Sequence, residues 1–135
     1  MNPLVPFLWM AGAVHLSIAI SNLWVRKILQ YRENLAKVSP MVRQVFVVHS
    51  IYMVLVLLAF SALCLCFAPE LAGGKGLGRF LSAFLAVFWL LRVILQFAFY
   101  DRDVRARYRL GDVAYTFAVS CLGIVFAVAA LGVVK

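Results

Sequence analysis

Four apolar stretches separated by short polar segments dominate the pattern of the chain. They cover roughly residues 3–24, 42–67, 79–100 and 112–134. Each reaches the length of about 20 mostly apolar residues that an α-helix needs to cross the hydrocarbon core of a bilayer. The stretches are apolar almost all round, whereas the helices of a soluble bundle keep a polar outer face. The pattern therefore predicts an all-α integral membrane protein with four transmembrane helices.

The connections between these stretches are short, and the composition agrees with a membrane location. Hydrophobic residues make up 66% of the 135 residues and charged residues only 13%, which excludes an ordinary soluble domain. The four stretches use nearly the whole chain, so we expect a single membrane domain over residues 1–135. Short connections make sequential helices neighbours, which predicts an up-and-down four-helix bundle.

Basic residues gather in the first and third connections and give the chain a net charge of +8. The first connection holds Arg26, Lys27, Arg32, Lys37 and Arg43 beside Glu33, and the third holds Arg102, Arg105, Arg107 and Arg109 beside Asp101, Asp103 and Asp112. By the positive-inside rule, residues 25–41 and 101–111 are then cytoplasmic and both termini lie outside. We expect the bacterial inner membrane, with basic loops that contact anionic lipids or fix the topology. This placement does not favour nucleic-acid binding.

Two histidines and an arginine lie on three of the predicted helices. Counted along the predicted spans, His15, His49 and Arg92 are each about 10–14 Å from the same membrane face, at about 1.5 Å rise per residue. A charged side chain in a membrane span is costly, so such residues mark functional sites by default. The shared depth predicts an intramembrane site.

Helical spacing places further polar residues on the same faces of these helices. In the third stretch Trp89, Arg92 and Gln96 follow one another at helical spacing, and Thr116 and Ser120 do so in the fourth. If these faces pack inward, they predict a pocket that opens toward the cytoplasm. We expect its lining to be His15, Asn22, His49, Tyr52, Trp89, Arg92, Gln96, Thr116 and Ser120.

The favoured function is binding of an amphipathic ligand with an anionic or carbonyl head, such as a quinone or a lipid, within a larger membrane system. No carboxylate lies in a span at the depth of Arg92, so a ligand can supply the opposite charge to its forked donors. A histidine, with an ordinary pKa near 6.5, suits proton exchange with such a head group.

We expect Asp112 to cap the fourth helix.

Three alternatives remain open at this point. The polar residues can form stabilising hydrogen bonds between helices in a purely structural subunit, which packs against other membrane subunits or against a second copy of this chain. His15 and His49 can be ligands of a b-type haem or a metal ion between two helices. A membrane enzyme can use histidine as acid–base and arginine to stabilise charge, although the sequence contains no nucleophile–base pair.

Overall fold

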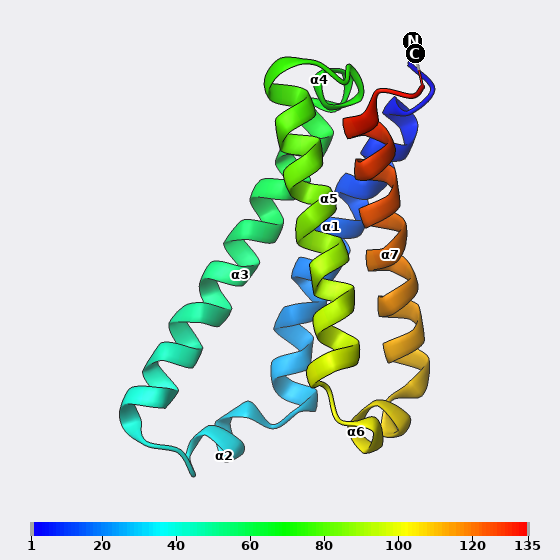
Figure 1. The fold of residues 1–135 in the computed structure, drawn as a ribbon. Helices are drawn as coiled ribbons and strands as arrows, with labels where there is room; N and C mark the ends of the chain where they lie inside the picture. The colour runs from blue at the N-terminus through cyan, green and yellow to red at the C-terminus, as the bar shows by residue number, and fades with distance from the viewer. Residues whose placement is uncertain (1, 135) are drawn as a thin grey trace. The chain divides into compact units, whose positions relative to one another are not determined.

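The computed structural model describes residues 2–134, apart from the side chain of Val104, and within this range it contains helices and no strand (Figure 1). The helices are α1 (Val5–Ile28), α2 (Tyr31–Leu35), α3 (Pro40–Cys66), α4 (Ala68–Ala72), α5 (Gly76–Phe99), α6 (Arg102–Arg107) and α7 (Arg109–Leu131).

Four of these helices, α1, α3, α5 and α7, are long and apolar enough to cross a membrane. They expose large apolar side chains such as Met41, Phe99 and Leu110, which are 75%, 80% and 87% exposed. Soluble monomers rarely expose apolar surface on this scale. The prediction of an all-helical protein with four helices of transmembrane length is confirmed, and it indicates an integral membrane protein.

The helices extend beyond the apolar stretches that predicted them. The helix α1 continues past residue 24 to Ile28, so that Arg26 and Lys27 form part of its last turn. Cations are favourable there because the C-terminal end of a helix carries partial negative charge. The helix α7 begins at Arg109, before the predicted start at Asp112. Hydropathy marks the apolar part of a helix, whereas the backbone hydrogen bonds continue into the polar segment.

The chain divides into two compact units. Unit 1 consists of residues 2–9 and 67–134, and unit 2 consists of residues 10–66. The long helix α1 therefore contributes its first turn to unit 1 and the rest to unit 2. The expectation of a single membrane domain over residues 1–135 stays a prediction.

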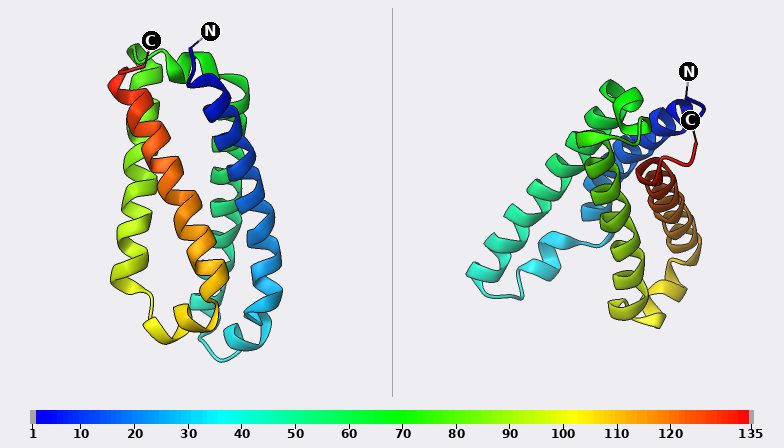
Figure 2. Two further views of the ribbon diagram at one scale, coloured as in Figure 1. Left: turned by 90° about the vertical axis from the view of Figure 1, so that its right-hand side faces the viewer. Right: turned by 45° about the horizontal axis from the view of Figure 1, so that its top comes forward.

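Unit 1 is built on α5 and α7, which lie side by side in the views of Figures 1 and 2. Their close approach depends on Gly123 of α7, because a Cβ at this position would lie 2.8 Å from the side chain of Leu90 on α5. The buried side chains of this unit include Leu85 and Trp89 on α5 and Phe126 on α7. Apolar burial and close packing thus hold the two helices together along their length.

A tight corner joins α4 to the start of α5 in unit 1. The backbone of Gly78 lies against that of Glu70, and a Cβ on Gly78 would overlap the carbonyl oxygen of Glu70. The buried hydroxyl of Ser82 donates a hydrogen bond of 3.1 Å to the carbonyl oxygen of Leu71. The side-chain amide of Asn2 donates to the carbonyl oxygens of Ala72 and Val134, both at 3.1 Å. Segments distant in the sequence therefore meet at this end of unit 1.

Unit 2 consists of most of α1 together with α2 and α3. The two long helices touch near Gly12, whose carbonyl oxygen accepts a hydrogen bond of 2.8 Å from Ser61 of α3. A Cβ on Gly12 would lie 2.9 Å from the side chain of Leu65, so only glycine allows this approach without movement. Toward α2 the two helices diverge (Figure 1), and residues 40–49 of α3 are exposed.

Candidate functional site

The imidazole of His15 lies in the packed part of unit 2. Its side chain is fully buried, and Nδ1 donates to the carbonyl oxygen of Ala11 at 2.6 Å. The ring packs edge-on against Phe60 of α3, with 5.7 Å between ring centroids. The bond to a carbonyl oxygen fixes the proton on Nδ1 in the neutral ring, which orients the imidazole.

The second histidine lies elsewhere in unit 2. His49 is exposed on α3, and it precedes Phe60, the residue that contacts His15, by eleven positions. Eleven residues of helix span about 16 Å. The two histidines are therefore not at the same level of this unit, because the contact between Gly12 and Ser61 sets the register of α1 against α3.

This register does not favour a haem or a metal ion held between His15 and His49. Two imidazole nitrogens must each come within about 2 Å of one ion, and a separation of about 16 Å along α3 prevents this. Among residues 2–134, no three His, Cys, Asp or Glu side chains are grouped so that they could hold a metal ion.

The remaining predicted residues of unit 2 are directed to their own helix or to the surroundings. The side-chain amide of Asn22 donates to the carbonyl oxygen of Ile18, one turn earlier, at 2.9 Å. The side chain of Tyr52 is 64% exposed. It stays a prediction that Asn22, Tyr52 and the two histidines line a ligand pocket.

In unit 1, Arg92 of α5 is held by two tyrosines. Its guanidinium carbon lies 5.4 Å from the ring centroid of Tyr100 and 5.3 Å from that of Tyr115 on α7. One guanidinium nitrogen also donates to the Tyr100 hydroxyl at 3.4 Å. Both tyrosine rings present their electron-rich faces to the cation, which stabilises the charge without neutralising it.

Gln96 of α5 and Thr116 of α7 are brought together in unit 1. The Gln96 amide is 3% exposed and donates both to the Thr116 hydroxyl at 2.8 Å and to the Asp112 carboxylate at 2.7 Å. The Thr116 and Ser120 hydroxyls donate to backbone carbonyl oxygens one turn earlier in α7. The oxygen of the same amide, Oε1 of Gln96, is buried and has no hydrogen-bond partner.

Asp112 belongs to this cluster and does not cap α7. The helix begins three residues earlier, so Asp112 lies inside its first turn, and the residue before the helix, Tyr108, makes no side-chain cap. The Asp112 carboxylate instead accepts hydrogen bonds of 3.0 and 2.8 Å from Arg105. This hydrogen-bonded carboxylate raises the pKa of the Arg105 guanidinium above its ordinary value.

A cavity of about 310 Å³ opens beside this cluster. The residues that line it come from α5, α6 and α7: Phe97, Arg105, Asp112, Val113, Thr116, Phe117 and Ser120. Two of the predicted site residues, Thr116 and Ser120, therefore line a cavity within unit 1. Trp89 is fully buried in the same unit.

Two residues of unit 1 were missed as parts of a site. Tyr115 faces Arg92 from α7, and Arg105 of α6 stacks on Phe97 with 4.5 Å from its guanidinium carbon to the ring centroid. The spacing of Asp112 and Thr116, one helical turn apart, was visible in the sequence. The contact of Arg105 with Asp112 depends on the turn between α6 and α7, which hydropathy does not indicate.

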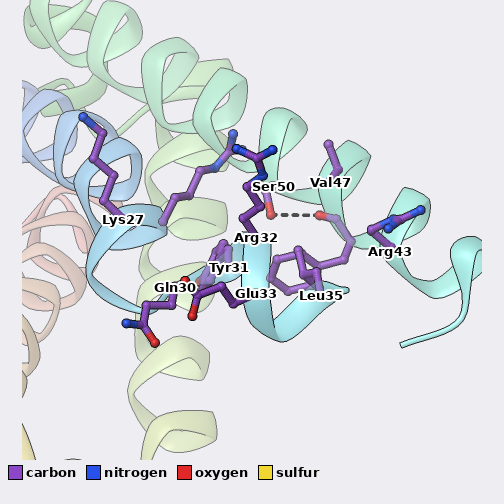
Figure 3. A pocket seen from close by; sticks show the side chains of 11 residues that line it. Lys27, Gln30, Tyr31, Arg32, Glu33, Leu35, Arg43, Val47 and Ser50 are labelled. Carbon is purple, nitrogen blue, oxygen red and sulfur yellow. Dashed lines mark hydrogen bonds between the residues drawn. The ribbon is translucent and has the colours of Figure 1, made fainter. Parts of the chain in front are cut away.

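Four basic residues are among those that line a second cavity, of about 630 Å³, in unit 2 (Figure 3). Its walls come from the end of α1, from α2 and from the start of α3: Arg26, Lys27, Gln30, Tyr31, Arg32, Glu33, Leu35, Arg43, Phe46, Val47 and Ser50. From the sequence, these basic residues were expected to contact anionic lipids or to fix the topology. The comparisons add no assignment: no protein-family model matches the chain, and no curated protein or solved structure is significantly similar to it.

Proposed function

We propose that this integral membrane protein binds an amphipathic ligand with an anionic or carbonyl head group, and that Arg92 is the main contact for that head. The observation that carries the proposal is the environment of Arg92. Within residues 2–134 the only ion pair joins Arg105 to Asp112, so Arg92 has no carboxylate partner there. Its charge remains available to an anion.

The energetic terms around Arg92 support this assignment. Two cation–π contacts contribute together about 1–2 kcal/mol, which offsets part of the cost of about 2.5–3.5 kcal/mol for an arginine at the centre of a span. Arg92 precedes the end of α5 at Phe99 by seven residues, which is about 10 Å of helix. The guanidinium thus lies below the end of the helix, where the head group of an embedded molecule would be found.

The chemistry of the neighbouring side chains suits the same ligand class. The Tyr100 and Tyr115 hydroxyls are donors beside a forked cation, and this combination recognises oxygen-rich heads such as a carboxylate, a phosphate or a quinone carbonyl. The proposal also includes the topology of the chain. Both termini lie outside a bacterial inner membrane, the loops at 25–41 and 101–111 are cytoplasmic, and the spans follow one another in up-and-down order. These features rest on the distribution of basic residues and on short connections.

The test is native mass spectrometry of the full chain extracted gently from its own membrane. We expect an added mass that matches one amphipathic molecule and is retained at least about tenfold less by Arg92→Leu, because a hydrogen-bonded charged contact is lost. Arg92→Lys keeps the positive charge but loses the paired guanidinium donors. It serves as the matched variant and should retain an intermediate amount of the ligand. Unaltered retention by a folded Arg92→Leu protein contradicts the proposal.

A second candidate, a structural subunit of a larger membrane assembly, is favoured by the exposure of α3. Only 11% of its most apolar segment is buried within the structure, against 28% for each of the other three long helices. The exposed segment also contains the titratable side chain of His49, which is costly to leave in lipid. A mild-detergent extract that migrates as a complex of defined larger mass, and from which His49→Leu dissociates, would favour this function over ligand binding.

A further inference from the structure

A cavity lies at the α2 end of unit 2, and Arg92 is not among the residues that line it. It measures about 630 Å³, which is within the range of pockets that hold small molecules. Lys27 lies at one edge and Arg43 at the other, with Tyr31 and Arg32 of α2 between them (Figure 3). Basic residues of three helices therefore line one cavity.

The charge around this cavity is unbalanced. Arg26, Lys27, Arg32 and Arg43 contribute four positive charges, and Glu33 is the one acid in the lining. In the part of the chain that the structure describes, none of these five side chains forms an ion pair. An anion that enters the cavity would meet guanidinium and ammonium donors that are not already used by carboxylates.

The geometry of the cavity is fixed by local structure. Gln30 adopts the left-handed conformation, with φ of 48°, and turns the chain sharply between α1 and α2. The Asn34 amide donates to the carbonyl oxygen of Leu29 at 2.9 Å and ties α2 back to the end of α1. The rings of Tyr31 and Phe46 meet edge to face, 5.2 Å apart, and join α2 to α3.

The position of the cavity favours a lipid over a soluble anion. Arg26 is in the last turn of α1 and Arg43 in the first turn of α3, so the cations lie at the ends of two helices of membrane length. Phe46 and Val47, which are 39% and 42% exposed, give the cavity an apolar wall that continues along the exposed start of α3. A head group at the cations would leave its acyl chains against that wall.

From these observations we infer that the cavity binds the phosphate head group of an anionic membrane lipid. Arginine recognises phosphate by paired hydrogen bonds, and lysine contributes a point charge. Basic pockets beside membrane helices select such heads from the neutral lipids around them. The N-terminal end of α3, which carries partial positive charge, adds to the attraction.

The test measures binding of phosphatidylglycerol to the full chain in phosphatidylcholine nanodiscs. The tested variant is Arg32→Gln with Arg43→Gln, and the matched control is Arg107→Gln with Arg109→Gln, which removes two cations of unit 1 that lie outside the cavity. At about fivefold for each cation near the surface, we expect the cavity variant to bind about 25-fold more weakly. The control should stay within about twofold of the parent.

Further arms of the experiment identify the ligand. Glu33→Gln removes the one acid and should tighten binding by about fivefold, which also tests the site if the double variant fails to fold. Soluble glycerol phosphate should compete poorly, because it lacks the acyl chains that the apolar wall contacts. Equal losses in cavity variant and control, or full competition by glycerol phosphate at the affinity of the lipid, would overturn the inference.

Discussion

Arg105 of unit 1 and the cations around the cavity of unit 2 differ in their partners. In unit 1, Arg105 is held by the Asp112 carboxylate and stacks on Phe97. In unit 2, the four cations around the cavity have no carboxylate partner within the described residues. A cation whose partner belongs to the chain contributes to the fold, whereas a cation without one is available to something outside the chain. The position of a cation in the sequence alone does not show whether it stabilises the fold or is available to a ligand.

The units also differ in how closely their helices approach one another. In unit 1 a glycine meets backbone at the corner between α4 and α5, and in unit 2 a glycine meets the movable side chain of Leu65. Backbone cannot move aside as a side chain can, so unit 1 has the less tolerant contact. The predictions below concern the free energy of unfolding of the full chain in mixed micelles with sodium dodecyl sulfate.

The largest effect is expected for Gly78→Ala. The new methyl group would overlap the Glu70 carbonyl oxygen, and we expect a loss of about 3 kcal/mol, the upper end for overpacking. Gly12→Ala in unit 2 should cost about 1 kcal/mol, because Leu65 can rotate. Gly111→Ala, with open space around the added methyl group, should raise stability by up to about 1 kcal/mol. Equal losses at Gly78 and Gly12 would contradict the contrast between the units.

A smaller effect is expected for Asp112→Ala in unit 1. The buried Gln96 amide would lose its charged acceptor, and we expect a loss of about 1.5 kcal/mol from that bond. The control is Asp103→Ala, an exposed acid of α6, which should change stability by less than about 0.5 kcal/mol. If both variants behave alike, the cluster around Asp112 does not stabilise unit 1.

The smallest effect compares two buried serines, one in each unit. Ser61→Ala removes the bond to Gly12 in unit 2, and Ser82→Ala removes the bond to Leu71 in unit 1. Each should cost about 0.6 kcal/mol, the average for side-chain hydrogen bonds between membrane helices. Ser50→Ala is the control, because its hydroxyl bonds only within α3, and it should leave stability unchanged. A cost at Ser50 equal to that at Ser61 would show that the interhelical bond is not the source of the effect.

The sequence predicted the four long helices because each contains an apolar run that a hydropathy pattern detects directly. Helical spacing also placed Gln96 and Thr116 in one predicted pocket. Their side chains form a hydrogen bond, and the pocket itself stays a prediction. It misjudged Asp112, because the start of α7 in a polar segment leaves no hydropathy signal. Hydropathy was therefore sufficient to find the apolar parts of the long helices but not their polar ends.

The register of α1 against α3 and the contact of α2 with α3 could not be predicted from the sequence. The levels of His15 and His49 were counted from the ends of the apolar stretches, but α1 continues to Ile28 and α3 begins at Pro40. Their actual register follows from the contact of Gly12 with Ser61, two small residues among many. The cavity of unit 2 depends on the contact between the rings of Tyr31 and Phe46, and the periodicity of the sequence does not indicate this contact.

The bonds of Asn2 have a consequence for the order of events during synthesis. A ribosome releases residues 10–66 as one continuous piece, so the contacts of unit 2 can form while α5 and α7 are still being made. Unit 1 is discontinuous, since residues 2–9 belong with 67–134. The Asn2 amide reaches the carbonyl oxygen of Val134 across 132 positions of chain, and this bond cannot exist until nearly all of those residues have been translated. Residues 2–9 therefore leave the ribosome long before their native partners in residues 67–134 have all been made.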